Sequence, residues 1–246
     1  VLLIQALFFA DGGLLAFGCN VFNLGFYTSF IAFPLIYKKL VNKDSKPGRI
    51  IAACVLSTVV GLQLGSLSVV FETLLSGKTE LPFTAFLILM QPVHLAIGLV
   101  EGFITAAVVL FVWKARPEIL SVNIHNEKSM SFKSVIIILA VVTVVIGGGL
   151  AYFASSYPDG LEWSIENITG GSEIEGGSAI HKAAEEIQEK TAIMPDYSFK
   201  EGNEALGTGV SGIVGGALTL VLVSVIGIII SLIKKRNKHG GASPKF

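Results

Sequence analysis

Polar side chains are scarce in the long apolar runs of this chain, and the few that occur there are the candidates for chemistry. Asp11, Asn20 and Asn23 lie in the glycine-rich segment between Ala10 and Gly25. Non-helical backbone at membrane depth is tolerated only where protein or a water-filled cavity covers it. The segment therefore has two interpretations: a re-entrant stretch that faces a substrate, or a tight outer turn whose asparagines cap helices.

His94 and Glu101 interrupt a later apolar run. They lie nearly two helical turns apart, so they could share a helix face. Imidazole is a ligand of late transition metals, and an intramembrane carboxylate usually faces the bundle interior or a transport pathway. A lone histidine is more often a structural polar group, however, and one carboxylate makes no metal site. His94 and Glu101 join Asp11, Asn20 and Asn23 as candidates to line a metal cavity. The alternative role of His94 and Glu101 is structural hydrogen bonding between helices.

The composition is that of a membrane protein. Of the 246 residues, 52% are hydrophobic and 15% are charged, and the mean hydropathy is +0.72; soluble domains carry roughly 25% charged residues. The 18 basic and 18 acidic residues balance, so the charge gives no indication of nucleic acid as a partner. Cys19 and Cys54 cannot form a disulfide framework, and no nucleophile–base or metalloprotease motif indicates an enzyme. We predict an all-α, polytopic helical bundle in contact with membrane lipid.

Spanning helices need about 20 apolar residues, because the hydrocarbon core is ~30 Å thick. Uncharged runs of that length cover residues 12–37, 50–71, 135–154 and 205–233. The run 81–113 is longer, and Pro92 should kink or break it into a short piece and a main span from about His94. Val1 to Ala10 has the character of the end of a truncated span, since the chain starts within an apolar run. We therefore expect four full spans and a truncated one.

Basic residues set the expected orientation. Fourteen of the 18 lysines and arginines fall in three segments, residues 38–49, 114–133 and 234–245. These segments share one side if the spans alternate, and an excess of basic residues marks cytoplasmic loops. The C-terminus is then cytoplasmic, and the acidic stretch 155–204 is extracytoplasmic.

The order of spans and loops predicts a membrane domain over residues 1–117, a cytoplasmic linker over 118–132 and a second domain over 133–246. The second domain should be a hairpin of two spans, at about 134–154 and 208–233, around the outer loop. Within that loop, Ile180 to Lys190 has the pattern of an amphipathic helix, and Gly170 to Gly177 that of a flexible connector.

Close helix packing is predicted where two glycines lie four positions apart within an apolar run. This spacing occurs at three places: Gly61 and Gly65, Gly98 and Gly102, and Gly212 and Gly216. The motif is common in apolar helices, so it indicates packing and identifies no partner.

Three segments resemble a known transporter family. The run QALFFADGGLLAFGCNVFNLGF, from Gln5 to Phe26, resembles the middle of the CbiM/NikM family, and His94 to Leu120 resembles its last span. These proteins are the substrate-binding membrane components of energy-coupling-factor cobalt and nickel transporters. The run YPDGLEW resembles the PDGLE-type CbiN/NikN small component, and its signature residues are Pro158, Asp159, Gly160, Leu161 and Glu162. The order of the segments resembles a fusion of the two components.

The resemblance implies that the first domain binds Ni²⁺ or Co²⁺ as cargo, with no permanently bound cofactor, in the inner membrane of a bacterium or archaeon. It implies two kinds of partner, a CbiQ/NikQ-like transmembrane coupling protein and CbiO/NikO-like ABC ATPase subunits, while the second domain assists metal loading. In the family, the principal ligands come from a Met-His N-terminus and a further histidine. No position of this chain matches them, so only the cavity candidates are carried over, and the chain as given should bind metal poorly.

Two other functions fit the same residues. A self-sufficient secondary transporter or channel for divalent metals would also use an intramembrane Glu101 and a glycine-rich segment, and its metal uptake would survive loss of the ATPase. A membrane assembly or sensor protein would use the acidic stretch 155–204 as its receptor, and that stretch would bind a partner without metal.

Overall fold

The computed structural model describes residues 1–42, 44–77, 81–120, 130–153, 157–171, 178–199 and 204–240, and within these ranges it contains helices and no strand. Five helices are long and apolar enough to cross a membrane. Large apolar side chains such as Phe30, Ile88 and Ile104 stay exposed on them, as expected of surfaces that face lipid. The prediction of an all-α polytopic membrane protein is confirmed. The expected number of four full spans was too small.

The chain forms two compact units. The larger unit comprises residues 15–139 and 155–184, and the smaller unit comprises residues 1–14, 140–154 and 185–246. The helices α6 (Phe132–Val144) and α8 (Ala179–Thr191) each cross from one unit to the other along the chain.

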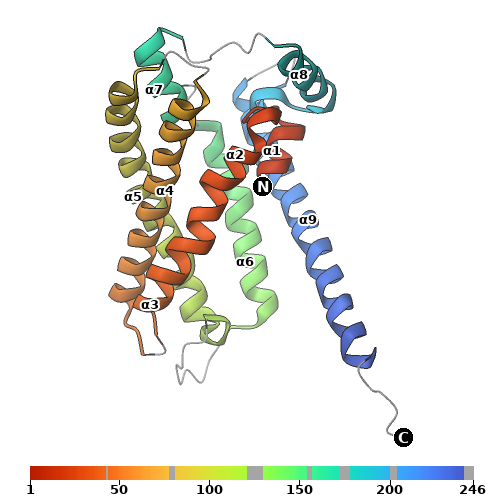
Figure 1. Cartoon of the computed structure of the whole chain (residues 1–246). Helices are drawn as coiled ribbons and strands as arrows, with labels where there is room; N and C mark the ends of the chain where they lie inside the picture. Colours follow the sequence, from red (N-terminus) through yellow and green to blue (C-terminus); the bar gives the residue numbers. More distant parts are fainter. Residues whose placement is uncertain are drawn as a thin grey trace, which may run out of the picture. The chain divides into compact units, whose positions relative to one another are not determined.

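Three long helices build the larger unit (Figure 1). The first runs over residues 14–40 and contains α2 (Phe17–Asn20), a wide π-helical segment (Val21–Tyr37) and α3 (Lys38–Leu40). The others are α4 (Pro47–Ser76) and α5 (Phe83–Ala115), and α4 packs against both neighbours. The glycine-rich stretch from Gly18 to Gly25 is therefore helical and forms no re-entrant loop. The turn lies earlier, where Ala10, Gly12 and Gly13 have positive φ.

Helix α5 is continuous through Pro92, so the predicted break is wrong. A proline lacks the backbone amide that would donate to the carbonyl four residues earlier, here that of Ile88, and local adjustment of the helix within a membrane bundle tolerates such a freed carbonyl. Next to Pro92, the Gln63 side chain of α4 donates to the Gln91 carbonyl at 2.8 Å and ties the two helices together at this turn. Because breaking the helix in hydrocarbon would expose several more backbone groups, the continuous helix costs less.

Glycines lie where α4 approaches its neighbours most closely. A Cβ added at Gly65 would lie 2.4 Å from the Asn23 carbonyl oxygen, and one at Gly61 would lie 2.8 Å from the Thr28 methyl. On the other side of α4, a Cβ at Gly98 or Gly102 of α5 would meet the Cα of Val59 or Val55 at 3.1 and 2.8 Å. Small residues thus let the three backbones pack together without a clash.

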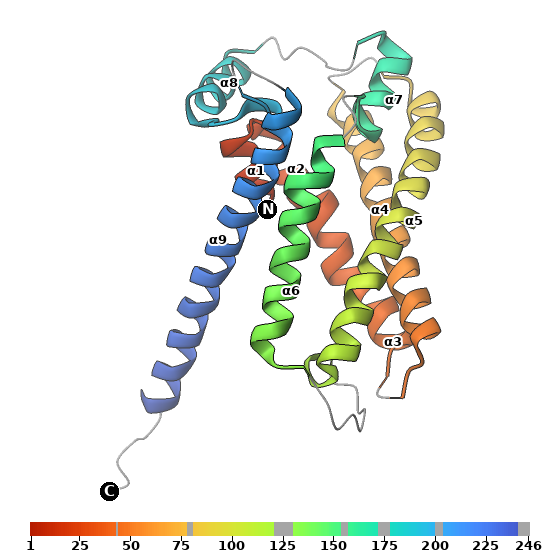
Figure 2. The ribbon, with the colours of Figure 1, turned by 180° about the vertical axis from the view of Figure 1, so that it is seen from behind.

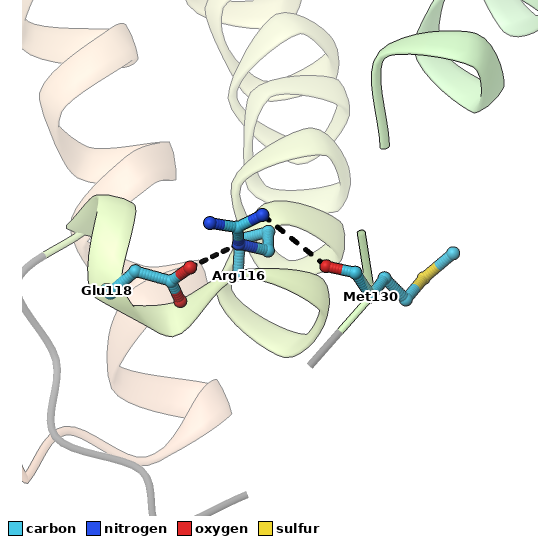
Figure 3. Close-up of polar contacts among 3 residues, drawn as sticks. All are labelled: Arg116, Glu118 and Met130. Carbon is cyan, nitrogen blue, oxygen red and sulfur yellow. Dashed lines mark hydrogen bonds and ion pairs between the residues drawn. The ribbon is translucent and has the colours of Figure 1, made fainter. Parts of the chain in front are cut away.

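The end of α5 is tied to the start of α6 by Arg116 (Figure 3). Its Nε pairs with the Glu118 carboxylate, and its Nη1 donates to the Met130 carbonyl at 3.5 Å. The Met130 amide donates to the Ala115 carbonyl at 3.1 Å, which closes the junction. The Glu118 carboxylate accepts a hydrogen bond from its own backbone amide and another from Arg116. These two bonds lower the pKa of Glu118 below its ordinary value. The short 3₁₀ turn Pro117–Leu120 carries this pair.

The smaller unit joins both ends of the chain (Figure 2). It contains α1 (Leu2–Phe8), the continuation of α6 through Val145–Gly149 and Leu150–Phe153, a 3₁₀ turn (Pro195–Tyr197) and α9 (Glu204–Gly240). A Cβ at Gly212 of α9 would lie 2.2 Å from the Gly147 carbonyl oxygen, while one at Gly216 would make an ordinary contact with Thr143 at 3.7 Å. Ile4, Phe9 and Met194 form the buried core.

Two predictions about residues 155–204 have different outcomes. The amphipathic helix expected at residues 180–190 is confirmed by α8. Of the predicted connector Gly170 to Gly177, the structure describes only Gly170 and Gly171. The rest of the connector lies outside the described residues. Gly170 ends the preceding helix in a left-handed conformation with φ of 82°.

The glycine contacts make a matched stability prediction. Gly102→Ala should lower the free energy of unfolding by about 1–3 kcal/mol, because the new methyl group meets the Val55 backbone of α4. Gly25→Ala is the control: it lies in a helix with no atom within 4 Å of the new Cβ, so it should be neutral or mildly stabilising. Thermal unfolding of both variants in detergent checks this, and equal effects would contradict the packing argument.

Candidate functional site

The larger unit places a buried amide against a carboxylate between its first two long helices. Asn23 is 4% exposed, and its Nδ2 donates to Glu72 Oε2 at 2.9 Å. Its Oδ1 is also buried but has no hydrogen-bond partner within the described residues. Gly65 makes this arrangement possible, since any side chain there would strike the Asn23 carbonyl. Asn23 thus brings an unpaired acceptor into the helix interface.

Cys19 lies one turn before Asn23 and hydrogen-bonds to the same Glu72 carboxylate. The carboxylate of α4 is therefore shared by an amide and a thiol of the first helix. Neither Cys19 nor Glu72 was among the predicted candidates. Their role depends on a pairing across the helices, to which the spacing along the sequence gives no guide.

A second polar network links α4 to α5. Gln63 donates to the Gln91 carbonyl, and the Gln91 side chain donates to Ser66 Oγ at 2.9 Å. Ser66 completes the loop by donating to the Gln63 carbonyl at 3.2 Å. Every polar side chain in this network has a partner, so the network stabilises the contact between the two helices.

His94 is held by its own helix. Its Nδ1 lies 2.9 Å from the Met90 carbonyl oxygen. A carbonyl only accepts, so Nδ1 carries a proton in this bond. The other side of the ring faces Gly160, where an added Cβ would lie 3.1 Å from His94 Cε1. His94 therefore fills a structural position next to the Pro158–Glu162 motif.

That motif builds the helix α7 (Gly160–Thr169) and docks it on α5. Asp159 accepts from the amides of Leu161 and Glu162 at 2.8 and 2.9 Å, and Glu162 accepts in return from the Asp159 amide. Gly160 leaves room for Val93, His94 and Ile97, as its Cβ would come within 2.9 Å of Val93. Leu161 then packs on a core of Val70, Phe86 and Met90.

Helix α7 was not among the predicted elements, although an aspartate three residues before a glutamate is the local signal of a capping box. Each residue of the motif from Asp159 to Glu162 now has a physical role. Asp159 and Glu162 satisfy the free backbone groups of the first turn, Gly160 permits close approach, and Leu161 anchors the helix.

Asp11 belongs to the smaller unit, where one oxygen of its carboxylate accepts two hydrogen bonds. It accepts from Gln5 Nε2 at 3.1 Å and from the hydroxyl of Tyr197, which also accepts from Gln5 at 3.0 Å. Burial, together with the bond to Asp11, raises the pKa of Tyr197 above its ordinary value. Gln188 fixes the same segment by donating to the Ala6 carbonyl and accepting from the Leu14 amide. The arrangement joins the first 14 residues to the turn before α9.

The predicted candidates are thus distributed over different places. Asn23 lies in the interface of the first helix and α4, His94 lies under α7, and Asp11 lies in the smaller unit. Asn20 lies in the first helix, at the end of α2 and three residues before Asn23. Glu101 lines a cavity between the helices of the larger unit. Within the parts of the chain that the structure describes, no three His, Cys, Asp or Glu side chains gather into a metal site.

Two regions of the chain match known protein families. Residues 1–119 match the model of the cobalt uptake substrate-specific transmembrane region, CbiM, and residues 133–232 match that of the PDGLE domain. The chain is a CbiM domain fused to a PDGLE domain. The motif that caps α7 therefore lies within the matched PDGLE region, and α7 packs on α5, the last long helix of the matched CbiM region.

Relatives that are named as nickel or cobalt transport proteins come from archaea and bacteria. A fused nickel transport protein NikMN of Archaeoglobus fulgidus is 28% identical over 90% of this chain and 67% of its own length. A cobalt transport protein CbiM 2 of Methanocorpusculum labreanum and a cobalt transport protein CbiM of Sorangium cellulosum are 32% and 33% identical over 49% and 48% of the chain. The chain spans about half the length of these last two relatives, 52% and 53%. No solved structure matches the chain significantly.

The capping box of the PDGLE motif gives a local prediction. Asp159→Ala should cost about 1 kcal/mol of helix stability, because two backbone amides of the first turn lose their acceptor. Asp159→Asn should retain most of it, since an asparagine oxygen also caps. Hydrogen exchange of the α7 amides measures the effect, with the exposed Glu166→Ala as control. Unchanged protection in Asp159→Ala would contradict the assigned role.

Tyr197 gives a prediction of pH dependence. Because its pKa is raised in the folded protein, the unfolded chain ionises first, above the ordinary tyrosine pKa of about 10. Its contribution to stability is complete below that pH and is lost as the pH rises further. Tyr197→Phe should cost about 1 kcal/mol at neutral pH through the lost bond to Asp11, and should make the alkaline decline shallower. Thermal unfolding between neutral and alkaline pH decides, and an unchanged decline would oppose this account.

Proposed function

We propose that this protein is the substrate-binding membrane component of an ATP-driven energy-coupling-factor importer for nickel or cobalt ions. The observation that carries the proposal is the order of the two domains, CbiM and then PDGLE, in one chain that aligns over 90% of its length with a fused nickel transport protein. The named relatives include nickel and cobalt transport proteins, so both ions are kept as cargo.

The partners of this importer are a CbiQ/NikQ-like transmembrane coupling protein and CbiO/NikO-like ATPase subunits. The proposed topology follows the charge pattern. Residues 38–49, 114–133 and 234–245 are basic and face the cytoplasm, where the ATPase acts, while the acidic stretch 155–204 faces outside. Arg116 and Glu118 then lie at the cytoplasmic junction between the two domains. An acidic outer stretch raises the local concentration of cations at the entrance.

The structure supports this role through the position of the PDGLE motif. It holds α7 against α4 and α5 beside His94, so the outer stretch of the second domain is anchored on the first. The buried polar groups Asn23 and Glu72 lie in the same three-helix unit. We assign Asn23 to the wall of the metal pathway and leave the principal ligands without an assignment in this chain.

The test is metal uptake by cells that coexpress the natural gene product with the neighbouring coupling protein and ATPase. Radioactive nickel or cobalt should accumulate, and a catalytic ATPase mutation should reduce accumulation to the background of cells without the transporter. Uptake that survives this mutation would replace the proposal by a self-sufficient metal transporter. If neither uptake nor metal binding by calorimetry is found, the assembly or sensor function takes its place.

A further inference from the structure

A cavity of about 460 Å³ lies between the three long helices of the CbiM domain. It is distinct from the Asn23–Glu72 pair and the Gln63–Gln91 network, since none of those residues lines it. Its walls are mainly apolar but carry a carboxylate, Glu101, and a thiol, Cys54. Five hydroxyl side chains also line it: Thr28, Tyr37, Ser57, Thr58 and Thr105.

Glu101 has no hydrogen bond or ion pair to any residue that the structure describes. This distinguishes it from Glu72, whose carboxylate is shared by Asn23 and Cys19. An unpaired carboxylate within a membrane span is costly, and such groups normally find a counter-charge in the bundle. The cavity next to Glu101 is large enough for an ion and several waters, at ~30 Å³ for each water.

Cys54 and Ser57 lie at the same depth as Glu101. Gly102 of α5 faces Val55 of α4, and Gly98 faces Val59, so the two helices are antiparallel and Glu101 is level with residue 56. At a rise of 1.5 Å per residue, Cys54 and Ser57 are displaced from that level by only about 3 and 1.5 Å along the axis. Both side chains line the cavity that Glu101 lines.

Two of these groups are available for a ligand. The Ser57 hydroxyl is fully buried and has no hydrogen-bond partner within the described residues. Cys54 is 2% exposed and is not in a disulfide. A buried hydroxyl without a partner costs free energy unless a ligand or water satisfies it. The carboxylate, thiol and hydroxyl therefore form a set of donors at one depth, open to one cavity.

Charge balance decides which cation suits this set. A carboxylate and a thiolate together carry two negative charges, so they neutralise one divalent ion and leave no net charge in the low-dielectric interior. Binding releases the thiol proton to water, as is usual for thiolate metal ligands. A sulfur and oxygen donor pair suits a borderline transition metal better than Mg²⁺ or Ca²⁺, which take oxygen ligands alone.

We infer that the Glu101 cavity is a second, transient site for the divalent transition-metal cargo, ligated by Glu101 and Cys54 and assisted by Ser57. The inference rests on the proposed function for the identity of the cargo. Two charged ligands completed by hydroxyls and water bind more weakly than a full set, which suits an ion that must leave again. The cavity extends to Tyr37 and Leu120, at the basic ends of the helices, so the site lies on the inward half of the path under the proposed topology.

The experiment is a Co²⁺ titration of the purified full chain in lipid nanodiscs without oxygen, followed by absorption spectroscopy. Co²⁺ bound to thiolate gives a near-ultraviolet charge-transfer band that oxygen or nitrogen ligands do not give. The chain has two cysteines, so Cys19→Ser is a matched control for Cys54→Ser. We expect the band in the wild type and in Cys19→Ser, and its loss in Cys54→Ser. Cys54→Ala gives the same readout without a hydroxyl in the core.

A matched pair of carboxylate variants tests the second ligand. Loss of a partner outside the coordination sphere already weakens metal affinity by about 10–100-fold, so Glu101→Gln should weaken Co²⁺ binding at least about tenfold. The control is Glu72→Gln, because the Glu72 carboxylate already interacts with Asn23 and Cys19. This substitution should leave the affinity for Co²⁺ unchanged. Size-exclusion chromatography and thermal unfolding establish that each variant is folded.

Three results would overturn the inference: a wild-type protein without the band, a band that persists in both Cys54 variants, or an affinity that depends on Glu72 and not on Glu101. These results are separate from failure of the proposed function. If cells take up nickel or cobalt through the ATPase but the band is absent, only the second site is wrong. If the band is present but no uptake occurs, the metal site stands and the transporter assignment fails.

Discussion

The close approach of α4 to its two neighbours is the constraint on which the CbiM domain depends. In lipid there is no hydrophobic force between helices, so they associate through van der Waals packing and hydrogen bonds. Gly61 and Gly65 admit the first helix, and Gly98 and Gly102 admit α4 itself to α5. Larger residues at these positions would separate the backbones. The polar side chains between them would then have no partner within reach.

Those polar contacts follow directly from the packing. Asn23 reaches Glu72 only because Gly65 lets its backbone lie against α4, and Gln63 reaches the Gln91 carbonyl because α4 and α5 are in contact along their length. An unsatisfied amide or carboxylate in hydrocarbon is expensive, so each bond also makes one register of the helices better than its alternatives. Packing by small residues and pairing of polar residues therefore support each other in this domain.

The PDGLE domain extends the same logic outside the spans. A motif that is a local capping box also places a glycine where a helix must lie on α5, and a leucine where the core has room. His94 takes its position from both sides, through its own helix at Met90 and through Gly160 of α7. The motif therefore serves both the start of α7 and its docking on α5.

The sequence by itself determined where the spanning segments lie, although one full span fewer was expected than the structure has. A membrane-crossing helix is specified by the length and polarity of one continuous segment. The sequence also contained the signal for α7, although Asp159 and Glu162 were interpreted only as part of a family signature. What the tertiary structure decided was continuity and pairing. Helix α5 continues through Pro92, beside the bond from Gln63 of α4 to the Gln91 carbonyl. Asn23 pairs with Glu72, 49 residues away, and Asp11 pairs with Tyr197, 186 residues away. Which side of a helix faces a neighbour, and at which register, depends on backbone contacts between segments, and these contacts exist only once the helices are packed.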